Sequence, residues 1–155
     1  MKFKVYSAAA SVMGIGYLPM APGTWASLAA AALWLVFQNY FPGFDRMQWT
    51  LVIACIIIGI VSSDYLIKHW GNDPSQIVID ELAGMWIACL LLPHQWKVIL
   101  TAFVLFRFFD IVKPLGIKKM EKLKGGLGVM MDDVLAGIYS NLCLQGLMLT
   151  GIWKN

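Results

Sequence analysis

The chain has 155 residues, of which 59% are apolar and only 14% are charged, and its mean hydropathy is +0.70. A soluble domain is usually about half apolar and about a quarter charged. The composition therefore excludes an ordinary soluble domain and favours an integral membrane protein. The formal net charge of +3 identifies no partner by itself, and we expect membrane lipid, but no nucleic acid, among the partners.

The first segment is a short apolar stretch after Lys2 and Lys4 that leads into residues 14–24, which are rich in Gly and Pro. Gly and Pro at this density exclude a regular spanning helix, so we predict an interfacial or re-entrant half-helix followed by an ordered loop. Apolar runs of roughly the length needed to cross a hydrocarbon core of about 27–30 Å follow. They occupy residues 25–41, 49–67, 77–92, 96–112 and 134–153. The sequence predicts one all-α domain, residues 1–155: a polytopic membrane helix bundle with about five spanning helices.

Basic residues predict the orientation of this bundle, because loops on the cytoplasmic side carry an excess of Lys and Arg. With the N-terminus inside, the inner side holds nine basic residues and the outer side three. The inner set is Lys2, Lys4, Lys68, Arg107, Lys113, Lys118, Lys119, Lys122 and Lys124. The same assignment places all the acids but Asp45 on the inner side. We expect a multi-pass protein whose functional face is cytoplasmic.

Acidic doublets open the third and fifth runs, and the second doublet follows a glycine-rich stretch that we interpret as a flexible turn. The four acids are Asp80, Glu81, Asp132 and Asp133. One acid at a helix N-terminus would be explained by the helix dipole, but four of them, with Asp110, favour a functional site. Both helices run outward from the inner face, and Gly84 and Gly137 would let them approach closely. Crowded carboxylates favour a bound cation, and oxygen ligands without nearby His or Cys suit Mg²⁺ or Mn²⁺.

The end of the fourth run adds basic groups to the same inner face. Arg107 and Asp110 are three residues apart and share one side of a helix, and Lys113 continues that side. Arg107 is either an ion-pair partner of Asp110 or a clamp for phosphate, whose oxygens match a guanidinium in two-point contact. Thr24 and Ser27, at the start of the first run, either cap a helix or belong to a phosphate-binding helix terminus.

Segments in four parts of the chain resemble phosphatidylglycerophosphatase A, a family of bacterial membrane lipid phosphatases. They are residues 14–28, 77–87, 106–114 and 125–137, in the family's order. The resemblance implies Mg²⁺-dependent hydrolysis of the terminal phosphomonoester of phosphatidylglycerophosphate to phosphatidylglycerol and phosphate. It also implies a location in the bacterial cytoplasmic (inner) membrane. The anionic lipid is then the substrate.

On this basis the candidate site has three overlapping groups. The predicted catalytic residues are Asp80, Glu81, Asp110, Asp132 and Asp133. The predicted Mg²⁺ ligands are Asp80, Glu81, Asp132 and Asp133. The predicted substrate-binding residues are Thr24, Ser27, Arg107 and Lys113.

Alternatives remain at the level of the sequence. The attacking group is either a metal-activated water, with a spare carboxylate as base, or an aspartate that forms a phosphoryl-enzyme. A phospholipid-synthesis phosphotransferase of the membrane is one rival function, although its usual widely spaced aspartates with an Ala-Arg pair are not found. A small cation-coupled transporter is another, although its acids would be expected nearer the membrane midplane. The sequence makes no prediction of the oligomeric state.

Overall fold

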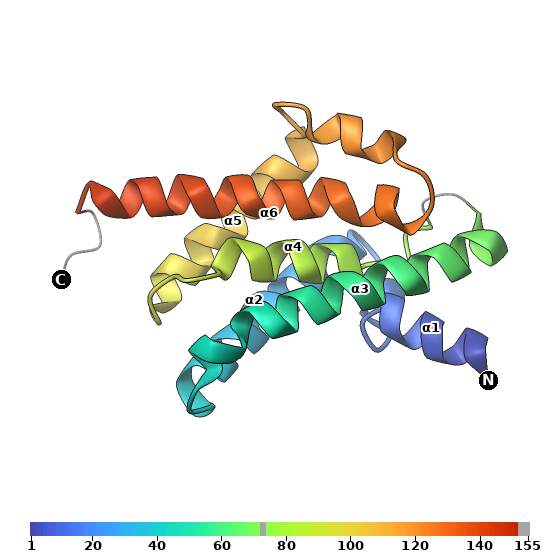
Figure 1. The fold of residues 1–155 in the computed structure, drawn as a ribbon, viewed down its shortest axis with the longest axis horizontal. Coiled ribbons are helices and arrows are strands. Elements are labelled where there is room, and N and C mark those ends of the chain that lie inside the picture. The colour runs from blue at the N-terminus through green and yellow to red at the C-terminus, as the bar shows by residue number, and fades with distance from the viewer. Residues whose placement is uncertain (72–73, 152–155) are drawn as a thin grey trace.

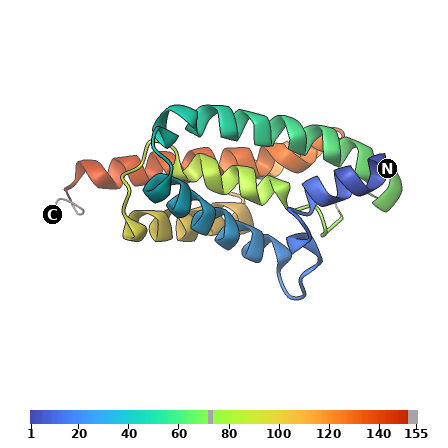
Figure 2. The same cartoon turned by 90° about the horizontal axis from the view of Figure 1, so that it is seen from below.

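The computed structural model describes residues 1–71 and 74–151. These residues form helices and no strand (Figure 1), which confirms the all-α prediction. The helices are α1 (Lys2–Ala10), η1 (Ile15–Tyr17), α2 (Pro22–Tyr40), α3 (Phe44–Trp70), α4 (Ile79–Cys89), α5 (Trp96–Val112), η2 (Ile117–Lys122) and α6 (Gly126–Leu149). The half-helix predicted near the N-terminus corresponds to α1, which packs against α3 (Figure 2).

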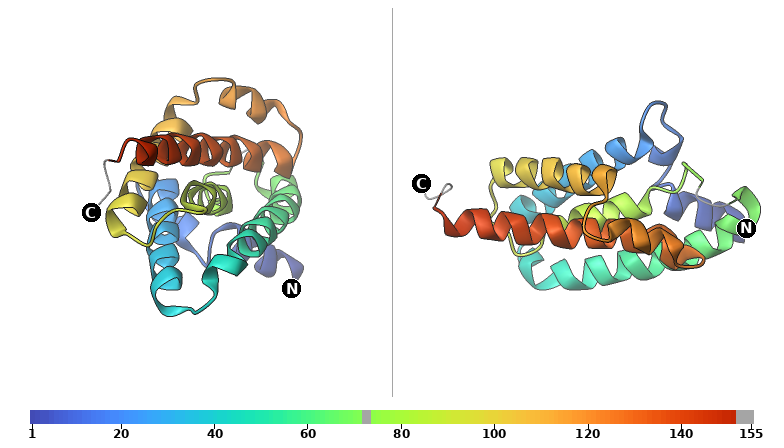
Figure 3. Two further views of the ribbon diagram at one scale, coloured as in Figure 1. Left: turned by 60° about the vertical axis from the view of Figure 1, so that its left-hand side comes forward. Right: turned by 90° about the horizontal axis from the view of Figure 1, so that it is seen from above.

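Helix α4 lies at the centre of the bundle. It packs against α2, α3, α5 and α6, and it is seen end-on inside this ring in Figure 3, left. Its Ala83, Met85 and Ala88 side chains are fully buried. Helices α2, α4 and α6 run in one direction and α3 and α5 in the other, so the first three begin at the end of the bundle where the other two finish (Figure 1). This arrangement gathers the functional segments predicted from sequence at one end.

Of the described helices, α3 and α6 are long and apolar enough to cross a membrane. Their length, together with exposed Ile53, Ile57 and Leu142, is consistent with lipid-facing surfaces. The prediction of five spans is not confirmed. Helix α4 has only 11 residues and rises about 16 Å, so it does not reach across a core of about 30 Å. The last predicted run ends at residue 153, and residues 152–153 lie outside the described part.

Because α4 is short, the chain continues inside the protein beyond the helix. The backbone N–H and C=O groups of residues 88–92 form hydrogen bonds with amide side chains from α2, α3 and α6. Asn141 Nδ2 donates to two carbonyl oxygens at 2.8 and 3.1 Å. Gln48 Oε1 accepts from one backbone N–H at 3.1 Å, and Gln38 Nε2 donates to a further carbonyl at 3.4 Å. These amide side chains are all buried. Irregular backbone away from water requires such partners.

The start of α6 differs from the prediction. We predicted a flexible glycine turn and a helix from residue 134, but the helix begins at Gly126. The backbone N–H of Gly126 donates to Asp64 Oδ1 at 2.5 Å, which satisfies one free donor of the first turn. A Cβ at Gly126 would collide with the Ile60 carbonyl oxygen. The glycine therefore permits close packing on α3, and flexibility is not its role here.

Helix α2 also begins earlier than predicted, at Pro22 and not at residue 25. Proline is favoured at the first helical position because its missing N–H is not needed there. Thr24 consequently lies in the first turn of α2, inside the helix.

Helices α4 and α6 meet at the glycines that the sequence singled out. A Cβ on Gly84 would lie 2.6 Å from the Asp133 carbonyl oxygen, and one on Gly137 would collide with the Gly84 carbonyl oxygen. The prediction that Gly84 and Gly137 allow close approach is confirmed. It places the acidic doublets of the two helices beside each other.

Candidate functional site

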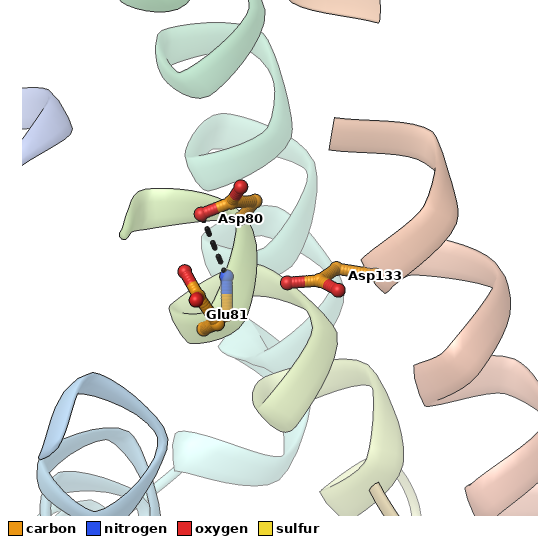
Figure 4. Close-up of side chains that lie close together, drawn as sticks. All are labelled: Asp80, Glu81 and Asp133. Atoms are coloured by element: carbon orange, nitrogen blue, oxygen red, sulfur yellow. Dashed lines mark hydrogen bonds between the residues drawn. The ribbon is translucent and has the colours of Figure 1, made fainter. Parts of the chain in front are cut away.

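The doublet Asp80-Glu81 lies in the first turn of α4, as predicted. Asp80 Oδ1 accepts a hydrogen bond from the Glu81 backbone N–H at 3.1 Å (Figure 4). This contact holds the Asp80 side chain over the N-terminus of the helix, where a negative charge is favoured by the helix dipole. Both acids are partly buried at the wall of a cavity.

Asp133 of α6 faces this doublet (Figure 4). Asp80, Glu81 and Asp133 each offer a carboxylate oxygen, and these oxygens all lie within 4.8 Å of one another. Asp133 is only 3% exposed. Buried like charges at this distance repel unless a cation lies between them.

Asp132 points in a different direction from its neighbour. Successive residues of an α-helix project about 100° apart, and Asp132 Oδ2 accepts from Lys113 Nζ at 2.6 Å instead of joining the group above. Lys113 Nζ also donates to Glu121 Oε1 at 2.7 Å. Asp132 thus connects the acidic group to the basic end of α5.

Arg107 and Asp110 form the ion pair that their spacing predicts, with Arg107 Nη1 2.6 Å from Asp110 Oδ2. Arg107 Nη1 also lies 3.5 Å from Ser27 Oγ of α2. Ser27 is fully buried, and its hydroxyl donates to the Gly23 carbonyl at 2.8 Å. Ser27 therefore contacts the guanidinium while it is held against its own helix.

One wide cavity, of about 740 Å³, joins these groups. Its acidic lining residues are Asp80, Glu81, Asp110, Glu121, Asp132 and Asp133, and its basic ones are Arg107, Lys113 and Lys124. Among the described lining residues, six acids thus face three bases. Thr24 is not among them, whereas its neighbours Pro22 and Gly23 are. Of the predicted site residues, Thr24 and Ser27 are therefore set back from the cavity, and the rest line it.

The residue set suits a hard divalent cation. Carboxylate oxygens are the ligands that Mg²⁺ and Mn²⁺ prefer. Two buried oxygens, Glu81 Oε2 and Asp132 Oδ1, have no hydrogen-bond partner in the described part of the chain. Buried polar atoms are nearly always paired, so these two oxygens are available as ligands for a cation. The described residues fit the metal that the sequence predicts, and its presence stays a prediction.

The electrostatics at the mouth of the cavity centre on Lys113. Burial lowers the pKa of Lys113, but the hydrogen bonds and charges of Asp132 and Glu121 outweigh it, and the net pKa is raised. The hydrogen bond from Lys113 holds the pKa of Glu121 below its usual value. Near neutral pH the lysine is thus an ammonium and the glutamate a carboxylate.

The contacts of three residues here were missed by the sequence analysis. Glu121 lies in a lysine-rich stretch, and such a stretch predicts a membrane-binding surface. Asp64, exposed on α3, serves the start of α6. A Cβ at Gly23 would collide with Glu81 Oε1. No spacing rule links these residues to the groups that they contact. The sequence did predict the two acidic doublets and the pairing of Arg107 with Asp110.

The fold and this cavity together define a helical membrane protein with a carboxylate-rich site at one end of its bundle. The chain belongs to the phosphatidylglycerophosphatase A family, whose model matches residues 8–148. The predicted resemblance is confirmed, and the chain is accordingly a phosphoric monoester hydrolase.

Curated relatives agree with the family match. The chain is 39% identical over 130 residues to phosphatidylglycerophosphatase A of Haemophilus influenzae, which covers 82% of this chain and 78% of the relative. It is 37% identical over 134 residues to the Escherichia coli protein of the same name, with 82% and 74% covered. It is 49% identical over 134 residues to a Bacteroides thetaiotaomicron protein named putative phosphatidylinositol-3-phosphatase, with 82% and 83% covered. No solved structure matches the chain significantly.

Proposed function

We propose that this protein hydrolyses the terminal phosphomonoester of phosphatidylglycerophosphate, with Mg²⁺ as cofactor, and yields phosphatidylglycerol and phosphate. The observation that carries the proposal is the convergence of Asp80, Glu81 and Asp133 within one cavity that also holds Arg107 and Lys113. Family membership supplies the lipid class, since two of the relatives carry the name of this activity. The phosphatase proposal also explains why carboxylates and basic side chains share a cavity, which a cation-coupled transporter does not require.

Asp80, Glu81 and Asp133 would hold the metal ion, and Asp132 would contribute its free Oδ1. A bound Mg²⁺ supplies a Lewis acid that neutralises charge on the phosphoryl oxygens. The proposed ligands are those predicted from sequence, and Asp132 differs from the other three by its contact with Lys113.

Arg107 and Lys113, which line the same cavity, would bind the phosphoryl oxygens. Asp110 holds the guanidinium at 2.6 Å and Ser27 contacts it at 3.5 Å, so Arg107 is oriented before substrate arrives. Arg107 Nε, buried and without a partner in the described residues, is a further donor for phosphate. In phosphoryl transfer such positioning and charge stabilisation are the main catalytic contributions.

The membrane arrangement follows from the same residues. We propose a multi-pass protein of the bacterial cytoplasmic membrane with the cavity at the cytoplasmic face. Lys113 and Lys124 line the cavity, and Lys118, Lys119 and Lys122 lie on η2 beside it. Basic residues at this end favour the cytoplasmic side and attract anionic lipid.

A second substrate is favoured by a specific finding, the 49% identity to a protein named putative phosphatidylinositol-3-phosphatase. Both named activities remove a phosphomonoester from the headgroup of a phosphatidyl lipid. Phosphatidylinositol 3-phosphate is therefore the second lipid to assay.

The experiment is phosphate release from purified protein in mixed micelles, with each lipid, with Mg²⁺ and with chelator. We expect release from phosphatidylglycerophosphate only with Mg²⁺. Asp80→Asn should lower kcat by about 10²-fold or more, because a charged group aimed at the reaction is lost. Asp45→Asn, the same change at the far end of the bundle, should leave kcat unaltered. Phosphate release in the presence of chelator, or full activity of the Asp80→Asn protein, would contradict the proposal.

A further inference from the structure

Lys113 is held between two carboxylates that belong to different elements. Its Nζ lies 2.6 Å from Asp132 Oδ2 and 2.7 Å from Glu121 Oε1. The lysine terminates α5 in a left-handed conformation, at φ 48° and ψ 49°, which directs its side chain back toward the cavity that all three residues line. The Lys113 ammonium thus already donates hydrogen bonds to two carboxylates.

The two partners are unequal in burial. The Asp132 side chain is 10% exposed and is carried by a helix packed into the core, whereas the Glu121 side chain is 44% exposed on the short helix η2. Exposed ion pairs are weak because water solvates both partners when they separate. Glu121 can therefore turn into solvent, and Asp132 cannot do so without moving α6.

The net charge of Lys113 and its two carboxylate partners determines whether this part of the cavity attracts or repels a phosphate. Two carboxylates around one ammonium leave a surplus negative charge, which repels a phosphomonoester dianion. With Glu121 turned away, Lys113 and Asp132 balance, and the ammonium regains a free donor for a phosphoryl oxygen. The departure of one carboxylate therefore favours phosphate binding at Lys113.

We propose that Glu121 is a displaceable partner of Lys113 that competes with the phosphomonoester dianion and so sets the affinity of the site for it. The inference rests on the proposed role of Lys113 in phosphate binding. Glu121 acts through Lys113 and is a positioning residue. The ligand chemistry is a phosphate dianion, supplied by a lipid headgroup or by free phosphate.

The test compares Glu121→Gln with wild type and with Asp45→Asn. The control removes the same charge from an exposed carboxylate that contacts His94 Nε2 at 3.1 Å, at the opposite end of the bundle. KM and kcat are measured with phosphatidylglycerophosphate in mixed micelles, and the Kd of inorganic phosphate is measured by titration calorimetry of the Mg²⁺-loaded protein in detergent.

We expect Glu121→Gln to lower KM and the phosphate Kd by about two- to five-fold, the range of a weak ion pair, with kcat changed less than KM. Asp45→Asn should match wild type in all three. A gain confined to inorganic phosphate supports the competition and assigns it to free phosphate. A gain in both assigns it to the lipid headgroup as well.

An unchanged or raised KM together with an unchanged or raised Kd in Glu121→Gln would overturn the inference. So would the same gain from Glu121→Gln in a protein that already carries Lys113→Met, because the effect is then not exerted through the lysine. Failure of the wild type to release phosphate from any lipid would defeat the proposed function instead. The calorimetric comparison still decides the inference in that case.

Discussion

At the scale of single residues, a backbone contact fixes one carboxylate of the site. Gly23, in the first turn of α2, lies against Glu81 of α4 so closely that a Cβ would collide with Glu81 Oε1. The next turn of α2 carries Ser27, which contacts Arg107. The beginning of α2 therefore supports both the acidic and the basic side of the cavity.

We predict that Gly23→Ala lowers kcat/KM for phosphate release by about tenfold or more. The added methyl displaces the Glu81 carboxylate, and a misplacement of about 1 Å can cost up to about 10²-fold. The matched control is Gly146→Ala in α6, where a Cβ meets open space. It should retain activity and gain up to about 1 kcal/mol of helix stability. Equal activity in the two variants would contradict the prediction.

Single residues also mark where sequence reasoning reaches its limit. The sequence grouped Asp132 with Asp133 because they are adjacent, yet the turn of the helix sends them to different partners. The pairing of Arg107 with Asp110 was predictable, since it is local to one helix. Glu121 could not be found in this way, because its contact with Lys113 depends on the path of the connection between α5 and α6.

At the scale of elements, α5 was predicted at residues 96–112 and is found at Trp96–Val112, because Pro93 and Lys113-Pro114 bound it. Helix α4 is shorter than its apolar run. The residues after it are as apolar as those within it, so hydropathy alone does not reveal the end. Tertiary contacts permit α4 to end here, because Asn141 and the two glutamines form hydrogen bonds with the backbone that follows the helix.

We predict that Asn141→Ala destabilises the protein by about 1–3 kcal/mol, since it leaves buried carbonyl groups at the end of α4 without a donor. The measurement is the midpoint of thermal unfolding in detergent. Asn39→Ala is the control, because its side chain is exposed and donates to the Leu35 carbonyl of its own helix. Activity per folded molecule should be retained in both, since Asn141 lies eight residues beyond Asp133 along α6. Equal midpoints for the two variants would refute this role.

At the scale of the whole molecule, the bundle has two chemically different ends. The cavity and the lysines of η2 lie at one end. The contact of Asp45 with His94 lies near the start of α3. With 27 residues, α3 rises about 40 Å, enough to place its two ends on opposite sides of a membrane. The side of the membrane that each end faces stays a prediction from the distribution of Lys and Arg, and the five spans predicted from apolar runs are not confirmed.

The orientation can be tested with cysteines at the two ends. Arg46→Cys and Lys119→Cys each place a thiol at an exposed position, in a protein whose exposed Cys143 is replaced by Ser. Cys55 and Cys89 are buried and should not react. We predict that a membrane-impermeant maleimide labels Arg46→Cys in intact bacterial cells and labels Lys119→Cys only after permeabilisation, as the proposed cytoplasmic orientation of the cavity end requires. The reverse pattern would invert the topology, and labelling of both thiols from outside would show that the ends are not separated by the membrane. In either case a phosphatase with its site on the cytoplasmic face would be excluded, whatever its activity in detergent.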